Sequence, residues 1–268
     1  MKRVVVALSF VVSSVVSSVA LADVPPSAPP TPVETPPPEA PAVVDPFAEP
    51  KKLVETEANT IGNLKKAIEL YEAALKDPAV EKKVAAAAQT DIARAYLRWG
   101  DLEKGNDAKI ALYEKGQAAG KKAEALDGKS AAAIFWGTAN QACIGRTRGV
   151  MNSLFMIGDL KKGMNRALEL DSNYHFARNT LGEIDHQVPG IAGGSDDRAE
   201  KAYLEVLKRD PHFTPTMVLL ANFYKDKGDD DKAKEWAQKV LDEKGAHPYQ
   251  DWVKFNKRDA KAVLNDLK

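Results

Sequence analysis

The sequence is short of the residues that disulfide bonds and strongly charged surfaces require. Cys143 is the only cysteine, so the chain cannot form an internal disulfide, and its stability has to come from a packed core. An excess of charge of either sign is also missing, because Lys+Arg and Asp+Glu number 38 each. This balance gives no electrostatic reason to expect a nucleic acid or an anionic membrane as partner. The apolar fraction of 44% is ordinary for a globular protein.

Motifs for catalysis and metal binding are missing as well. The chain has four histidines, His175, His186, His212 and His247. They are far apart in sequence and none has HExxH spacing, so no zinc site is predicted. There is no GxxxxGK[ST] phosphate loop, no EF-hand spacing of acids, and no Ser–His–Asp set that the sequence supports. Cys143 lies on an apolar helical face, which favours a buried thiol over a nucleophile. We therefore predict no cofactor, no metal and no enzymatic activity.

The N-terminal 50 residues differ in composition from the rest. Residues 1–22 have a basic start, an apolar stretch diluted by serine, and the Ala-Leu-Ala pattern that signal peptidase reads, so we predict a cleaved signal peptide and a periplasmic location. Asp23 stands where a lipoprotein needs cysteine, which predicts a soluble or loosely envelope-associated protein. Residues 23–50 hold 11 of the 16 prolines and are predicted to form a disordered linker, either a tether or a leader without a role.

From about residue 51 the apolar residues have helical spacing. Leu64, Ala67, Ile68 and Tyr71 recur at i, i+3, i+4 and i+7, which is the pattern of one buried helix face. Asp77-Pro78 follows, and we predict that Asp77 caps the next helix with Pro78 in its first position. The alternation of β-branched residues that is typical of strands is missing. The chain is therefore predicted to be all-α.

The helical segments are similar to one another. Small and apolar residues recur at spacings of four and three, as in Ala233, Ala237 and Val240, and an Asp-Pro turn ends one such helix at 210–211. The segments 199–211 and 216–241 resemble tetratricopeptide repeats, which stack helix pairs to bury a continuous core. We expect residues 51–268 to form a tetratricopeptide-like α-solenoid of about four to five helix pairs with a C-terminal capping helix.

The loop HQVPGIAGGSDD, residues 186–197, interrupts the helical pattern with one proline and three glycines. Three interpretations exist for such a loop: a phosphate cradle, a metal site, or a spacer between two helices. No strand is expected before it and the acidic residues lack calcium-site spacing, so we favour a widened turn within one helix pair. Ser195 or Asp197 is predicted to cap the helix that starts near Arg198.

Four segments in order carry a narrower resemblance: FWGTAN (135–140), RALELDSNYHFA (166–177), LGEIDHQVPGIAGGSDDRAEKAYLEVLKRDPHF (181–213) and LLANFYKDKGDDDKAKEWAQKVL (219–241). This order resembles the T-component family associated with TRAP transporters, which are periplasmic tetratricopeptide-like helical proteins. The most specific part is the loop, with marker residues Pro189, Gly190, Gly193, Gly194 and Ser195. The resemblance implies an apolar pocket or tunnel, a homotrimer, and partnership with a periplasmic substrate-binding protein of a TRAP transporter.

The region 134–171 is crowded with aromatic and methionine side chains. Methionine adapts to irregular apolar ligands, although such a stripe at helical spacing is also typical of plain core. The residues predicted to line an apolar pocket are Phe135, Trp136, Asn140, Met151, Phe155, Met156 and Met164. Arg146 and Arg148 flank a turn nearby, where they are either solvated or placed to meet an acidic ligand or partner.

Two hypotheses for function follow. The first is a non-enzymatic periplasmic binding or adaptor protein, resembling the T-component that assists TRAP-type uptake of a small apolar or amphipathic ligand. The alternative is a generic tetratricopeptide scaffold for protein–protein interaction in the cell envelope, since such stacks hold peptides in their groove. An internal apolar cavity lined by Trp136, Phe155 and Met156 would weaken the alternative.

Overall fold

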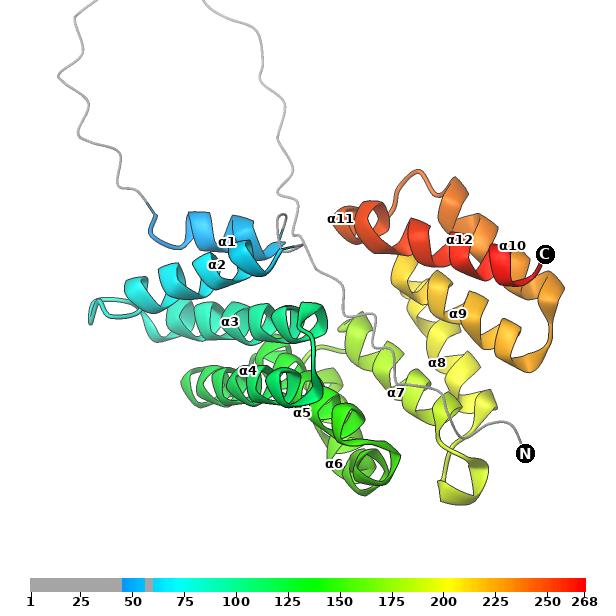
Figure 1. Cartoon of the computed structure of the whole chain (residues 1–268), viewed down its shortest axis with the longest axis horizontal. Helices are drawn as coiled ribbons and strands as arrows, with labels where there is room; N and C mark the ends of the chain where they lie inside the picture. Colours follow the sequence, from blue (N-terminus) through cyan, green and yellow to red (C-terminus); the bar gives the residue numbers. More distant parts are fainter. Residues whose placement is uncertain (1–44, 56–59) are drawn as a thin grey trace, which may run out of the picture.

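The computed structural model describes residues 45–55 and 60–268, and these residues form a stack of helices (Figure 1). The predicted signal peptide, 1–22, and most of the predicted linker, 23–44, lie outside the described residues. The helices are α1 (Ala48–Glu55), α2 (Ile61–Ala74), α3 (Lys82–Leu102), α4 (Asn106–Leu126), α5 (Ala131–Arg148), α6 (Val150–Leu170), α7 (His175–Gln187), η1 (Gly190–Ala192), α8 (Asp196–Arg209), α9 (Thr214–Lys227), α10 (Asp230–Asp242), α11 (Tyr249–Asp251), η2 (Trp252–Asn256) and α12 (Lys257–Asp266).

Successive helices pack in antiparallel pairs: α1 with α2, α3 with α4, α5 with α6, α7 with α8, and α9 with α10. The terminal helices α11, η2 and α12 cover the last pair, where α12 packs on α9 and α10. No strand occurs in the described ranges, where one isolated bridge joins Phe213 and His247. The prediction of an all-α solenoid with about four to five pairs and a C-terminal cap is therefore confirmed.

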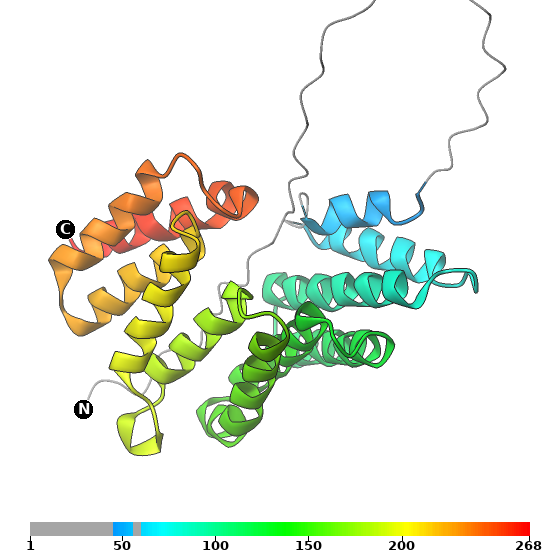
Figure 2. The same ribbon diagram turned by 180° about the vertical axis from the view of Figure 1, so that it is seen from behind.

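The stack bends into an arc. Pairs α1/α2 to α5/α6 form one arm and α7/α8 to α12 the other, and the two views in Figures 1 and 2 agree on this arrangement. The arms are joined where α6 packs on α7, and they also approach each other at Arg98 of α3. Its Nη1 donates a hydrogen bond of 3.2 Å to the carbonyl oxygen of Val54 in α1, and its Nη2 lies 4.0 Å from a carboxylate oxygen of Asp251 in α11.

Two boundaries differ from the sequence-based expectation. The first helix begins at Ala48, so residues 48–50, assigned to the linker, are helical, because proline is tolerated in a first helical turn and Pro50 is buried there. Asp77 does not cap the next helix, which begins at Lys82. Instead, the Asp77 carboxylate accepts a hydrogen bond of 2.8 Å from the backbone N–H of Ala79, which closes a turn that competes with helix formation.

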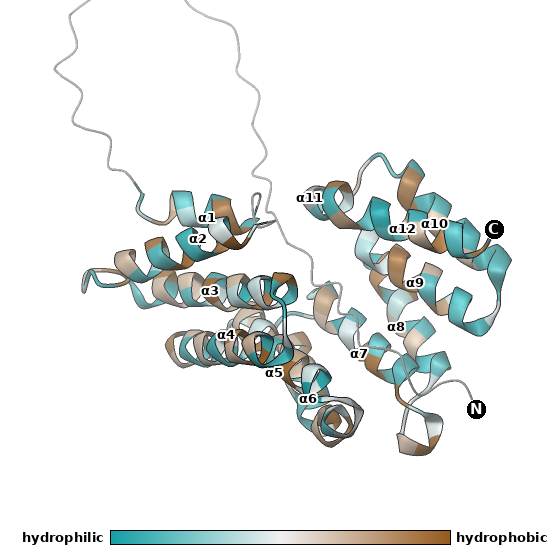
Figure 3. Cartoon of the chain, in the orientation of Figure 1, coloured by the Kyte–Doolittle hydropathy of each residue, from teal (hydrophilic) through white to brown (hydrophobic). Residues whose placement is uncertain are grey.

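The first and second helices of each pair have different surroundings. The second helices α8 and α10 are amphipathic, with one narrow buried stripe each, and the colours of Figure 3 alternate along α10. The first helices α5 and α9 are buried on most sides. Enclosure by neighbours on several sides explains why α5 and α9 carry long apolar and small-residue runs. No helix in the described part of the chain is long and apolar enough to cross a membrane.

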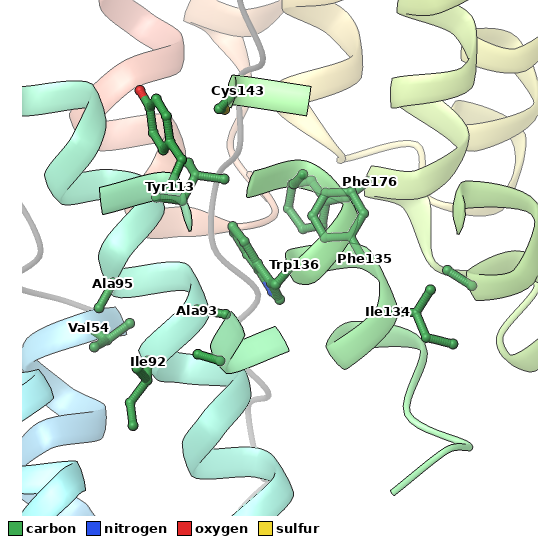
Figure 4. Close-up of a cluster of buried hydrophobic side chains, with 14 of the residues drawn as sticks. Val54, Ile92, Ala93, Ala95, Tyr113, Ile134, Phe135, Trp136, Cys143 and Phe176 are labelled. Carbon is green, nitrogen blue, oxygen red and sulfur yellow. The ribbon is translucent and has the colours of Figure 1, made fainter. Parts of the chain in front are cut away.

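The core is divided along the stack. One cluster of buried side chains runs from α1 to the α8–α9 turn and includes Phe135, Trp136 and Phe176, which lie close together in Figure 4. A second cluster lies within α8 to α12. Between α4 and α5 the backbones themselves touch, because a Cβ placed on Gly120 would lie 2.4 Å from the Cα of Gly137.

Candidate functional site

A small residue marks the place where the two helices of a pair cross. In four successive pairs these residues are Gly100, Gly145, Gly182 and Ala221. A Cβ on each of the three glycines would lie within 2.3–2.7 Å of a side chain on the second helix of its pair, in order Tyr113, Met156 and Tyr203. Ala221 is fully buried in the corresponding position of α9. These crossings fix the rotation of α3, α5, α7 and α9 about their axes.

A polar residue follows each small residue directly. We call these four residues, Asp101, Arg146, Glu183 and Asn222, the inner polar row. Because the crossing residue before each one faces the second helix, the row occupies equivalent positions on four successive first helices. Neighbouring members interact: Arg146 Nη2 lies 3.2 Å from Asp101 Oδ1, and Arg146 also acts on the charge of Glu183. Sequence reasoning missed the row, although aligned Gly-Asp, Gly-Arg, Gly-Glu and Ala-Asn pairs carry its signal.

Glu183 is the most enclosed member of the inner polar row, with 6% of its surface exposed. Burial raises the pKa of its carboxyl group to about 8, against the opposing effect of the positive charge on Arg146. At neutral pH the carboxyl group is therefore mostly protonated, and it can donate a hydrogen bond as well as accept one. The row thus comprises an aspartate, an arginine, an enclosed glutamate with a raised pKa and an asparagine in sequence.

Polar groups concentrate on the first helices throughout the described ranges. The buried polar and charged residues are Thr90, Arg94, Arg98, Asn140, Asn179, Thr180, Glu183, Asp185, Thr214, Thr216, Asp251 and Asn256. Ten of them lie on the first helices α3, α5, α7 and α9, and Asp251 and Asn256 lie on α11 and η2. Buried polar groups lower stability unless they are paired, and several of these are paired within the fold, as Thr216 is with Asn179 and Thr214 with Asn256.

The residues predicted to line an apolar pocket are divided among several environments. Phe135, Trp136 and Met164 belong to the large core cluster, and Met156 packs in a separate small cluster around Ile184. Asn140 is fully buried and its amide donates to the carbonyl oxygens of Ala93 and Trp136.

The two remaining members of the predicted pocket lie on α6. Phe155 is 82% exposed, so it does not share an enclosed space with Trp136. The side chain of Met151 lies outside the described part of the structure. The apolar pocket therefore stays a prediction, and its best-assembled members are Phe135, Trp136 and Met164.

The loop at 186–197 is an ordered joint between α7 and α8. Pro189 precedes the short helix η1, and Gly193 has φ +89°, a left-handed conformation that favours glycine. A Cβ on Gly194 would lie 1.7 Å from the carbonyl oxygen of Val188, so the chain passes its own backbone there. Ser195 caps α8, because its hydroxyl oxygen accepts a hydrogen bond from the N–H of Arg198. The predicted cap and the interpretation as a widened turn are confirmed.

Charged side chains fasten this joint to its neighbours. Asp185 accepts two hydrogen bonds from the Arg198 guanidinium, of 2.9 and 3.0 Å, and lies 2.6 Å from Nζ of Lys161 on α6. Burial alone would raise the pKa of Asp185, but its hydrogen bonds to Arg198 and Lys161 outweigh burial and lower the pKa. Asp185 therefore stays ionised and links α6, α7 and α8.

His186 connects the same joint to α9. Its Nδ1 lies 2.8 Å from Asp196 Oδ1 and its Nε2 lies 3.4 Å from Asp226 Oδ2. Burial alone would lower the pKa of His186, but the hydrogen bonds to Asp226 and Asp196 outweigh it and raise the pKa above 6.5. The imidazole is thus held between two carboxylates and has a structural role in the joint.

We expect His186→Gln to remove a pH-dependent part of the stability. Because the pKa of His186 is raised on folding, its stabilisation is complete below pH 6.5 and is lost as the pH rises through the folded-state pKa. Each unit between the unfolded and folded pKa contributes about 1.4 kcal/mol. Denaturation by urea at several pH values from 5 to 9 measures this, and an identical pH profile for the wild type and the variant would contradict the assignment.

The remaining residues singled out by sequence have structural surroundings. Cys143 is buried, and burial raises the pKa of its thiol to about 12, which confirms the prediction of a buried small side chain. Arg148 is about half exposed and pairs with Glu114 at 2.9 Å. In the described ranges, no group of three His, Cys, Asp or Glu side chains is placed to hold a metal ion.

Comparisons with known proteins agree with this geometry. Residues 214–247, which comprise α9, α10 and the turn after them, match the model of the tetratricopeptide repeat. TTC0263, a thermophilic TPR protein from Thermus thermophilus, has a similar structure with a TM-score of 0.59 and 19% sequence identity, covering 82% of this chain and 97% of that one. MamA is also similar, with a TM-score of 0.43 and 22% identity, covering 70% of this chain and 92% of that one.

These likenesses concern the fold alone, and a search of curated proteins found no match. Neither the repeat model nor the likeness to TTC0263 points to a transporter-related family. Taken with the repeated crossing residues and the stacked pairs, the repeat match at 214–247 and the likeness to TTC0263 show a tetratricopeptide-like architecture. The chain contains a tetratricopeptide repeat at 214–247 and folds as a tetratricopeptide-like α-solenoid.

Proposed function

We propose that the chain is a non-enzymatic scaffold that binds another polypeptide along its first helices. The observation that carries this proposal is the inner polar row, which continues over α3, α5, α7 and α9 at equivalent positions. A repeated row of hydrogen-bonding and charged groups suits an extended polypeptide, whose backbone offers donors and acceptors at regular intervals. The tetratricopeptide-like fold supports the same conclusion, because stacked repeats create extended binding surfaces.

Site-specific photo-cross-linking in the source cells tests this proposal. A photoreactive amino acid is placed in the inner polar row at Asp101 or Asn222, and at the exposed positions Lys122 of α4 and Lys234 of α10 as controls. We expect defined protein adducts from the row and none of the same mass from the second helices. Equal adducts from both sets, or none from the row, would show that the first helices do not hold a polypeptide.

A narrower function is a T-component of a TRAP transporter, exported to the periplasm and paired with a substrate-binding protein. It is supported by the resemblance over about residues 55–245, which is best from residue 131 on, and by the ordered marker loop, in which Gly194 and Ser195 have specific structural roles. Native mass spectrometry of the protein isolated from the cell envelope provides the test. This function predicts a trimer, a processed N-terminus after residue 22, and a co-purified substrate-binding protein. A monomer with an intact N-terminus and no such partner would exclude it.

A further inference from the structure

Arg94 of α3 is a buried cation with an unused hydrogen-bonding edge. Only 4% of the residue is exposed, and its guanidinium carbon lies 5.5 Å from the centre of the Trp136 ring on α5. Two of its nitrogen atoms, Nε and Nη2, are fully enclosed and have no hydrogen-bond partner. Stacking on the indole face stabilises the charge but satisfies no N–H group.

A second buried arginine lies close to Arg94. Arg98 lies one helical turn further along α3 and is also buried. Burial and the charge of Arg94 lower the pKa of Arg98 to about 9, although Asp251 opposes the shift. Two guanidinium groups four residues apart on one helix repel each other, so a second anion near Arg94 would stabilise this part of the stack.

None of the nearby acidic groups pairs with the open edge of Arg94. Asp91 accepts a hydrogen bond of 2.7 Å from the hydroxyl of Tyr71, and Asp251 lies on the side of Arg98. Glu55 is close enough for Arg94 to affect its charge, but burial is the larger effect and raises the pKa of that carboxyl group. None of the three accepts a hydrogen bond from Nε or Nη2 of Arg94.

The geometry of the two unpaired nitrogen atoms of Arg94 indicates which class of ligand would bind them. Nε and Nη2 form the edge of a guanidinium that presents two parallel N–H groups, and a carboxylate matches this edge with one oxygen on each. An unpaired buried charge lowers the stability of the folded state, and a bidentate carboxylate removes most of that penalty.

We propose that Arg94 is a binding site for a carboxylate, which lies side-on against Nε and Nη2 beside the face of Trp136. The carboxylate belongs either to a small organic acid or to a bound polypeptide. The site therefore does not depend on the scaffold function proposed above. Arg94 is the residue that recognises the ligand, and Trp136 positions its guanidinium.

Thermal unfolding of the full chain tests the site. The probes are sodium acetate and sodium succinate, with sodium chloride at equal ionic strength and acetamide as controls. The polypeptide source is tested with a short peptide carrying a free C-terminal carboxylate and with its amidated form. The variants are Arg94→Met, Arg94→Lys and, as a matched control outside the site, Arg148→Met, since Arg148 is about half exposed.

We expect carboxylates to raise the unfolding midpoint of the wild type and of Arg148→Met by about 2–4 °C and to leave Arg94→Met unchanged. Without ligand, Arg94→Met should unfold at a higher temperature than the wild type, because it removes a buried charge. Arg94→Lys keeps the charge but lacks the paired edge, so its response should be weaker. A response to acetate or succinate alone identifies a small acid, and a response to the free-carboxylate peptide alone identifies a polypeptide.

Two results would overturn the proposal. One is an equal response of the wild type to carboxylates, chloride and acetamide. The other is the same carboxylate response in Arg94→Met as in the wild type. If Arg94→Met fails to fold, the Nε–H resonance of Arg94 in ¹⁵N-labelled wild type, assigned through Arg94→Lys, gives the answer, since a resonance that does not move with acetate excludes the site.

Discussion

Replacing Gly120 with alanine should lower the free energy of unfolding by about 2 kcal/mol. The new Cβ would lie 2.4 Å from the Cα of Gly137, which is backbone and cannot rotate away as a flexible side chain could. Helices α4 and α5 must therefore separate. Overpacking of this kind costs up to about 3 kcal/mol, while the higher helix propensity of alanine returns about 1 kcal/mol. The unfolding midpoint should fall by about 4–8 °C in a thermal scan.

Gly158→Ala provides the matched control for Gly120→Ala. Gly158 lies within α6, and a Cβ there would meet nothing within 4 Å. The substitution should therefore show the propensity effect alone and raise the stability by about 0.5–1 kcal/mol. The two Gly→Ala substitutions are therefore expected to change the free energy of unfolding in opposite directions. Equal effects of the two substitutions would show that α4 and α5 do not touch backbone to backbone.

Gly194→Ala should be more destabilising, by about 3 kcal/mol or more. The added Cβ would lie 1.7 Å from the carbonyl oxygen of Val188 and 2.9 Å from that of Asp185, so the joint between α7 and α8 has to open. Opening it also loses the hydrogen bond of 2.7 Å from the Ser195 N–H to the Asp185 carbonyl oxygen. Urea denaturation measures the loss, and hydrogen exchange should show faster exchange at the start of α8.

Gly190 and Gly193 of the same loop are controls for Gly194, because an added Cβ at either position would make no steric contact. A Cβ on Gly190 would meet nothing within 4 Å, so Gly190→Ala should change the stability by less than about 0.5 kcal/mol. Gly193 also has open space but a φ of +89°, so Gly193→Ala should cost about 1–2 kcal/mol through backbone strain alone. The expected order is therefore Gly190, Gly193, Gly194. A different order would contradict the close backbone approach at Gly194.

The loop shows how far local sequence reasoning reaches. The run of glycines and the serine before two aspartates predicted a helix end, a widened turn and a cap, and Ser195 indeed caps α8. Such features depend on a few neighbouring residues. The hydrogen bonds of His186 to Asp196 and Asp226 could not be predicted, because Asp226 is 40 residues away and reaches the loop only when α9 packs beside α7.

The residues predicted to line a pocket show where local sequence reasoning stops. Helical spacing placed Trp136, Phe155 and Met156 in one apolar stretch, but the turn at Gly149 separates α5 from α6, and Phe155 faces solvent while Trp136 is buried. Asp77 also differs from its prediction as a helix cap. Its side chain closes a turn, and the next helix begins only at Lys82. Proximity in sequence did not give proximity in space once the chain reversed direction.

The sequence by itself determined the helical class, the pairing of helices and the capping end, because these follow from apolar spacing, small crossing residues and local turn chemistry. Only the tertiary structure decided which polar groups the first helices bring together. The inner polar row and the open edge of Arg94 depend on how each pair is rotated against the next, and therefore on contacts such as Gly120 with Gly137. Rotation accumulates over successive pairs, so side chains far apart in sequence meet at distances that no local pattern encodes.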